Sequence, residues 1–486
     1  MKTTQVFFLF LIANFFSVAQ ERLGSTNSNY YSTNSIQLNP SASVDSRTYM
    51  QLQLVGANVY AKTNFAYLPD FNIKQVTNPP DFVRTGKGNK KYLYANGSIE
   101  GPSFVISKRT YGLGFFTRVR TVVDMRRVSY ELATVLLKGE GFGAVQNRDL
   151  LGQDFKNAKF SSMSWAEYGV NFGKMIKRQR DVMISVGGNL KYLTGINIMY
   201  ANIIDFESYY NSPTSFGVDA LNAKVLRNTS RWNSGKGLGL DLGITYKIME
   251  NYVDKYYANS KLSNCDYVDY KCKIGISLRD AGFIKFKGST VKTTVTGAGH
   301  FDPNNDTSFV NVIETNFKNT TTLDKNIWAS LPTALTGQFD YNFDNSIYLN
   351  FTVVKNLVPT QVTGVQSPDL LSICPRVELR QFEFALPLTF QKFIYPQLGF
   401  GLRYRSFVVG MDNMFPLFLT RDTYSFNFYM SLAISIFRNP ACNTKSMSVS
   451  KCPSYRKTGK NRPKKRKNFS SHKKKRGSGS SGPGIF

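Results

Sequence analysis

Charged residues lie at alternate positions in several stretches of this sequence, and their types allow two kinds of chemistry. Basic residues outnumber acidic ones, so the set could line an anion-selective pore. Alternatively, both signs could pair and fill an enclosed lumen, which we favour because charges shielded from water need partners. Asp241 is then expected to pair with an inward arginine or lysine. The candidate inward-facing residues are Arg118, Arg120, Glu167, Lys191, Asp241, Lys247, Lys273, Arg279, Arg403 and Arg405.

The elements that position these charges are predicted to be β-strands. In Lys236–Ile248, one row of alternate residues is Leu, Leu, Leu, Ile, Tyr and Ile, and the other is Gly, Gly, Asp, Gly, Thr and Lys. A period of two places the rows on opposite faces of a strand. The same alternation recurs in stretches that begin near Met50, Tyr111, Ala166, Val182, Ile274, Ile347, Leu398 and Phe428.

The N-terminus predicts export. Residues 1–19 combine an early lysine, an apolar run and a small-residue cleavage site, which is typical of a secretory signal peptide. No later run is apolar for the roughly 18 residues that a membrane helix needs, so a membrane-inserted chain must form a closed β-barrel. We therefore predict an all-β, antiparallel transmembrane barrel of 12 to 16 strands; a soluble β-sandwich is the alternative.

The predicted organisation has four parts. Residues 20–46 are polar and lack periodicity, and we expect them to form a plug-like segment before a barrel at 47–438. Residues 439–486 form a basic tail. Barrels of this kind have short turns at one end and long loops at the other. We expect turns at Lys177–Asp181 and Asn342–Ser346, and long connections at 61–90, 121–160, 199–235, 249–270 and 289–330.

The tail holds 14 Lys/Arg and no Asp or Glu from Asn443 onward, about half of the formal charge of +29. We expect it to be disordered in the periplasm and to bind an anionic partner there, such as lipid head groups, peptidoglycan or an acidic protein face. Export argues against nucleic acid. The clusters are Lys464, Lys465, Arg466 and Lys467, followed by Lys473, Lys474, Lys475 and Arg476.

The remaining reactive side chains predict little chemistry. In an exported protein, Cys265–Cys272 and Cys442–Cys452 are the sensible local disulfides, which leaves Cys374 free. The sequence has no Gly-rich phosphate loop or nucleophile elbow, and a Ser–His pair would need His300, which we place in a long loop. We expect no enzyme, cofactor or metal. Asp280 and Asp412 could bind a cation where strands end, although such residues more often make turns.

Several motifs together resemble a family of Bacteroidota outer-membrane barrels of unknown function. Asn39–Ala42 (NPSA) also resembles the Asn-Pro-Ala element before the first strand of FadL-like, PorV-type and PorP/SprF-type barrels. The resemblance implies about 14 strands and an N-terminal segment inside the lumen. The other motifs are Ile99–Ser103, Arg118–Arg120, Gly239–Tyr246, Gly275–Phe286 and Gly399–Asp412.

Relatives of this kind include parts of secretion and gliding machinery and channels for hydrophobic substrates. Our expectation is a non-enzymatic component of an envelope complex concerned with secretion, gliding or barrel assembly. It would be embedded in outer-membrane lipid and held by protein partners. The rival is a FadL-like channel for hydrophobic or anionic small molecules, and the third possibility is a soluble secreted binding protein. Fold does not choose among them.

Overall fold

A computed structural model describes most of the region that we predict to be barrel. Residues 1–21 and 438–486 lie outside the described residues, and with them the signal peptide, the basic tail, Cys442 and Cys452; Cys265 does so too. The described residues are 22–44, 46–71, 83–84, 90–128, 155–212, 215–228, 231–251, 259, 269–287, 290–301, 320–324, 326–343, 346–359, 362–391, 395–414 and 421–437.

Three short helical segments precede the first strand. They are α2 (Leu23–Thr26), α3 (Ser32–Leu38) and the 3₁₀ helix η1 (Pro40–Ser43). Each is rich in Ser, Asn and Thr, which compete with helical hydrogen bonds and keep helices short. Within the described part of the chain, no helix is long and apolar enough to cross a membrane.

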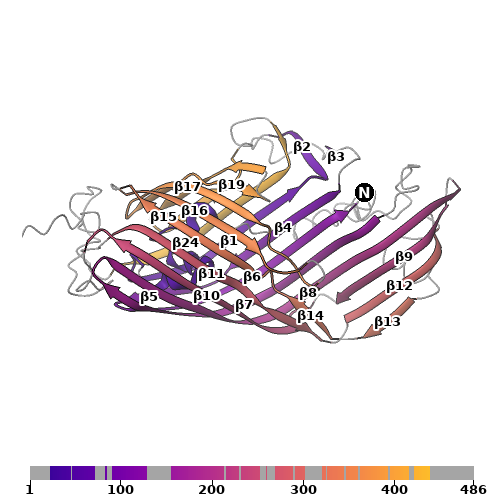
Figure 1. The fold of residues 1–486 in the computed structure, drawn as a ribbon, viewed down its shortest axis with the longest axis horizontal. Coiled ribbons are helices and arrows are strands. Elements are labelled where there is room, and N and C mark those ends of the chain that lie inside the picture. The colour runs from indigo at the N-terminus through magenta and orange to yellow at the C-terminus, as the bar shows by residue number, and fades with distance from the viewer. Residues whose placement is uncertain are drawn as a thin grey trace, which may run out of the picture.

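The rest of the described chain is antiparallel β-sheet (Figure 1). The strands of the first half are β1 (Met50–Thr63), β2 (Ala66–Phe71), β3 (Val83–Arg84), β4 (Lys91–Glu100), β5 (Ser103–Lys108), β6 (Tyr111–Val128), β7 (Phe155–Gln179), β8 (Val182–Ser212), β9 (Ser215–Asn228), β10 (Gly235–Met249) and β11 (Tyr270–Phe286). Those of the second half are β12 (Thr290–Phe301), β13 (Thr320–Asp324), β14 (Ile327–Ser330), β15 (Ala334–Asn342), β16 (Ile347–Asn356), β17 (Leu370–Glu378), β18 (Phe382–Ala385), β19 (Leu388–Gln391), β20 (Tyr395–Leu398), β21 (Phe400–Tyr404), β22 (Phe407–Met411), β23 (Arg421–Thr423) and β24 (Ser425–Ile436).

The sheet closes on itself, because β1 pairs with β24 from Met50 opposite Ile436 to Lys62 opposite Ser425. Several short strands continue one another end to end, such as β4 with β5 and β18 with β19, so the closed barrel has 14 strands. The prediction of a closed antiparallel outer-membrane barrel of about 14 strands is confirmed.

The alternating rows take opposite sides of the wall, as β10 illustrates. Leu238, Leu240 and Leu242 are 59%, 40% and 49% exposed, whereas Asp241 is 1% exposed. The outer surface is therefore a belt of aliphatic and aromatic side chains, and the polar row lines the lumen.

The strands run further than their apolar rows do. β8 continues to Ser212, and β9, β12 and β13 occupy much of 199–235 and 289–330, where we expected loops. These strands project at the right of Figure 1. The expectation was wrong because backbone pairing continues beyond the apolar belt, where no lipid imposes a period of two.

The connection at 249–270 also differs from expectation. Met249 donates its N–H to the carbonyl of Asp181 at 2.7 Å, beside the tight turn that joins β7 to β8. The connection therefore leaves from the end that carries the short turns, where β1 begins and β24 ends. Both ends of this long connection thus lie at the short-turn end of the barrel.

Candidate functional site

The lumen is occupied by residues 22–49, which we call the plug. Side chains throughout α2, α3 and η1 are buried although most are polar. Such burial is stable only where each polar group finds a partner. The polar row of the barrel wall supplies those partners, so the plug and the inner face of the wall form one hydrogen-bonded unit.

The first part of the plug is held by an ion pair. Arg22 lies 2.7 Å from Glu100 of β4, and both side chains are at most 4% exposed. Tyr31 donates its hydroxyl to Ser431 of β24 at 2.5 Å. Burial and the nearby Glu100 carboxylate raise the pKa of the Tyr31 phenol, so it stays a neutral donor.

Asn39 fixes the turn that begins η1. Its side-chain oxygen accepts hydrogen bonds from the N–H and the hydroxyl of Ser41, at 3.2 and 2.8 Å, as an N-cap does. Its amide group donates to the carbonyl of Ile244, and Ser41 lies 2.7 Å from the hydroxyl of Thr245. The NPSA element therefore docks on β10, the strand with which the charge pattern was first recognised.

Glycines on the inner face of the wall make room for η1. A Cβ atom on Gly187 would lie 2.6 Å from the backbone carbon of Pro40, and one on Gly173 would lie 2.6 Å from Ser43 Oγ. Both distances are shorter than a non-bonded contact allows. The glycine rows of β7, β8 and β10 are thus the seat of the plug, a role that alternation alone did not reveal.

Glu167 is the centre of the first group of ion pairs, which we call the central ion network. It lies 2.5 Å from Arg118 and 3.0 Å from Arg120. The indole N–H of Trp165 also donates to it at 2.7 Å. Arg118 in turn donates to Gln37 at 2.8 Å, which connects the network to the plug.

Lys191 extends the central ion network across the wall. Its ammonium lies 2.6 Å from Asp241 and 2.7 Å from Asp280, and Asp280 also pairs with Arg120 at 2.9 Å. Asn189 donates to the other oxygen of Asp241 at 2.8 Å. These residues meet because β6, β7, β8, β10 and β11 are neighbouring strands, and their pairing places the inward-facing residues at the same height in the barrel.

The prediction that Asp280 lies where a strand ends was wrong. It lies inside β11, at an irregularity in the pairing with β10, and it has a left-handed φ of 53° that aspartate tolerates better than most residues. Its N–H donates to Asp241 at 2.6 Å. Asp412 does follow a strand, as expected, and its N–H donates to Asn427.

A second ion network lies toward the short-turn end. Arg376 pairs with Asp340 at 2.7 Å and with Glu378 at 2.6 Å, and Lys273 lies 3.0 Å from Asp340. Arg47 of the plug lies 2.7 Å from Asp269. Of these residues, only Lys273 is among the inward-facing charges predicted from the sequence. Asp340, Arg376 and Glu378 follow the same alternation, but in stretches whose other face is less apolar.

The other candidates have separate environments. Lys247 lies over the ring of Tyr270, Arg279 is buried, and Arg403 pairs with Glu383 at 2.9 Å. The prediction for Arg405 was wrong: it is exposed in the turn between β21 and β22, with a left-handed φ of 52°. The strand ends one residue earlier than its alternation suggested.

The remaining reactive groups form no site among the described residues. Cys272 is a free thiol, so the disulfide predicted with Cys265 is not formed in the structure; Cys374 is free and buried. His300 lies within β12 and not in a loop. No group of three or more His, Cys, Asp or Glu residues in the described segments could hold a metal ion.

On the side of the central ion network away from the short turns, apolar side chains pack across the lumen, although Asp124 and Lys159 are also buried there. We call this cluster the apolar layer; it packs around Trp165, Ile284 and Phe286, which are fully buried. Val365 joins it from the connection between β16 and β17. The backbone N–H of Ser330 donates to the carbonyl of Thr363 at 2.9 Å, so residues 363–365 of this connection are held against the inside of the wall.

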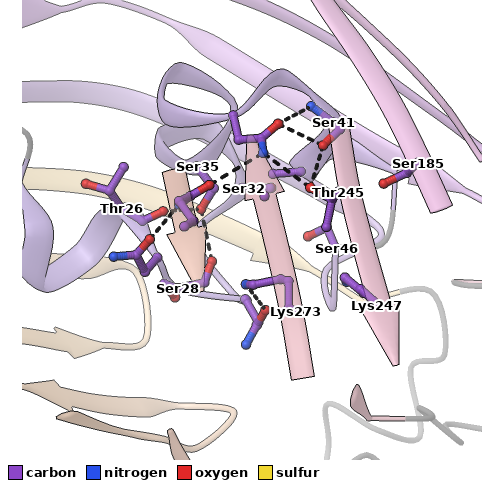
Figure 2. Close-up of a pocket in the computed structure, with 16 residues that line it drawn as sticks. Thr26, Ser28, Ser32, Ser35, Ser41, Ser46, Ser185, Thr245, Lys247 and Lys273 are labelled. Atoms are coloured by element: carbon purple, nitrogen blue, oxygen red, sulfur yellow. Dashed lines mark hydrogen bonds between the residues drawn. The ribbon is translucent and has the colours of Figure 1, made fainter. Parts of the chain in front are cut away.

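Small cavities remain beside the plug. One, shown in Figure 2, is about 50 Å³ and is lined mainly by Ser, Thr and Asn, with Lys247 and Lys273. A second of about 50 Å³ lies against Arg22, Glu100 and the central ion network. Both are polar and have room for a few water molecules.

These features define a plugged β-barrel of the outer-membrane type. The model of a family of unknown function, DUF5723, matches residues 40–412, from η1 to the residue after β22, and the chain belongs to this family. No curated protein matches the sequence significantly.

Solved structures with a similar arrangement include outer-membrane channels. A TodX deltaS2S3 mutant monoaromatic hydrocarbon channel is 10% identical, with a TM-score of 0.44 over 87% of this chain and 97% of that one. The P. putida toluene transporter TodX is also 10% identical, with a TM-score of 0.42 over 84% and 95%. A Pseudomonas aeruginosa FadL homologue is 9% identical, with a TM-score of 0.24 over 86% and 96%.

Proposed function

We propose that this protein is a sealed outer-membrane barrel that anchors an envelope complex and docks its partners, without catalysing a reaction. The observation that carries this proposal is the occupation of the lumen by the plug. Ion pairs and hydrogen bonds join the plug to β1, β4, β6, β10 and β24. A barrel that acts as an anchor needs a stable wall and no open passage.

The geometry of the lumen supports docking over small-molecule passage. Pockets for drug-sized ligands are usually apolar and about 300–1,000 Å³. The cavities beside the plug are lined mainly by polar side chains and are about 50 Å³ each, and the cavity of about 210 Å³ next to Tyr94 and Asp124 is also below this range. A hydrophobic solute would have to displace both the plug and the apolar layer, and would leave buried charges without partners.

The projecting strands offer the docking surface. β8 has 31 residues, about 100 Å of extended chain, whereas about 10 residues cross a membrane. Its outer part pairs with β9, β9 pairs with β12, and β12 pairs with β13. This sheet stands beyond the apolar belt, where a protein partner can reach it without entering the lipid.

The same proposal includes the orientation of the barrel in the membrane and the kind of complex that the protein serves. The short-turn end faces the periplasm, so the basic tail that follows β24 hangs there and binds an anionic partner. The complex serves secretion, gliding or barrel assembly in a Bacteroidota envelope. Deletion of 453–486 is expected to preserve the barrel and weaken envelope association in a salt-sensitive way.

Site-specific photo-crosslinking in intact cells tests the docking role. A photoreactive residue at Ile204 of β8, which is 44% exposed, is expected to capture one or a few discrete proteins. The same residue at Leu240, within the apolar belt, is the matched control and is expected to capture lipid. Capture of no protein at Ile204, together with saturable uptake of a hydrocarbon by the purified barrel, would overturn the proposal in favour of a channel.

A further inference from the structure

Two lysines lie side by side on the outer surface of the barrel. Lys236 of β10 is paired in register with Lys285 of β11, and both belong to outward rows. Lys236 is exposed and Lys285 is partly exposed. Directly paired side chains on one face have Cβ atoms about 4.5–5.5 Å apart, so the two lysine side chains leave the wall at neighbouring points.

Like charges placed directly opposite each other destabilise a sheet unless an anion lies between them. Within the described part of the chain, no carboxylate forms an ion pair with Lys236 or Lys285. The ammonium of Lys285 instead lies over the ring of Trp328, 5.1 Å from the ring centre. The pair therefore presents positive charge outward.

The position of the pair relates it to the membrane. Two positions further toward the middle of the membrane, on the same lipid-facing side of each strand, lie Leu238, 59% exposed, and Phe283, 48% exposed. Trp328 of β14 pairs with Lys285 and packs edge-on against Phe283, with ring centres 4.7 Å apart. Tryptophan and lysine are typical of the boundary between hydrocarbon and head groups. The lysines lie at the edge of the apolar belt away from the short turns.

We propose that Lys236 and Lys285, with Trp328, bind the phosphate of an outer-leaflet glycolipid of the lipid A type. The phosphate accepts hydrogen bonds from both ammonium groups, which removes their repulsion, and the acyl chains lie along Leu238 and Phe283. The proposal rests on the outer-membrane setting and on the orientation proposed above, with the short turns facing the periplasm, and not on the docking role. Failure of the crosslinking experiment would leave it standing.

Native mass spectrometry of the full-length protein in detergent, titrated with purified lipid A, tests the site. The double variant Lys236→Gln with Lys285→Gln is expected to bind lipid A about tenfold more weakly, the effect of losing one or two charge-assisted hydrogen bonds. Lys236→Arg with Lys285→Arg keeps both charges and is expected to bind as the wild type does.

Three controls make the result specific. Lys174→Gln with Lys271→Gln removes two exposed lysines near the short-turn end and is expected to leave binding unchanged. Dephosphorylated lipid A and phosphatidylglycerol are expected to bind the wild type more weakly than lipid A. Retention of heat-modifiable mobility on gels shows that each variant is a folded barrel. Equal binding by both glutamine variants, or equal binding of lipid A and its dephosphorylated form, would overturn the site.

Discussion

The two halves of the lumen are closed by opposite means. Toward the short turns, the plug fills the barrel with hydrogen bonds and ion pairs, and glycines of the wall make room for it. Toward the projecting strands, apolar side chains of the wall and Val365 pack across the same barrel, beside a cavity of about 210 Å³ next to Tyr94 and Asp124. The boundary lies at Trp165, which donates to Glu167 on one side and packs in the apolar layer on the other.

The two halves of the lumen therefore depend on different interactions to stay closed. The polar half depends on individual partners, because removal of one member leaves another buried charge unpaired. The apolar half depends on filled volume and tolerates changes that conserve it. The two halves are held by different contacts, so we expect that the two closures can be broken separately.

Glu167→Ala is expected to have the largest effect on stability. Among the described residues it leaves Arg118 and Arg120 to share the carboxylate of Asp280, with Arg118 also bonded to Gln37, which costs about 4 kcal/mol of unfolding free energy. Denaturant titration of the barrel in lipid vesicles measures this. A loss below about 1 kcal/mol would show that water already solvates these arginines.

Phe286→Ala probes the apolar half and is expected to cost about 3 kcal/mol, since it opens a cavity in a filled layer. The plug should stay in place, because no ion pair is lost. Phe286→Leu is the matched control and should cost less. A released plug in Phe286→Ala, detected by protease cleavage within residues 22–49, would mean that the two closures are not separate.

Gly187→Ala tests the seat of the plug and is expected to cost about 2 kcal/mol, because the new methyl group meets the backbone of Pro40. Gly337→Ala is the control, since a Cβ atom there meets nothing within 4 Å. Labelling of a cysteine introduced at Ser41 reports plug release. Equal labelling of the two alanine variants would show that η1 does not depend on the glycine seat.

The sequence predicted the wall far better than its contents. A period of two is a property of each strand alone, so β10 and the inward position of Asp241 could be read from local residues. Which charges meet depends on register between strands far apart in sequence, as for Lys191 with Asp280. Pairing of that kind has no local signal.

For three residues of the lumen, the sequence did not predict the position or the partner, and each case has a physical reason. Asp280 sits at an irregularity where β11 departs from regular alternation, so a period of two gives the wrong count there. Val365 lies in a connection that folds back against the wall through backbone hydrogen bonds, which any sequence can make. Glu100 was present in a recognised motif, but its partner Arg22 lies in a segment without periodicity.

Ion conductance across a planar lipid bilayer tests the sealed lumen most directly. We expect no steady current from the wild type, little from a variant that lacks residues 22–44, and a larger steady current when Trp165→Ala and Phe286→Ala also open the apolar layer. The order follows from two separate closures. A steady current through the wild-type barrel would contradict the account, because the plug and the apolar layer would then leave a passage.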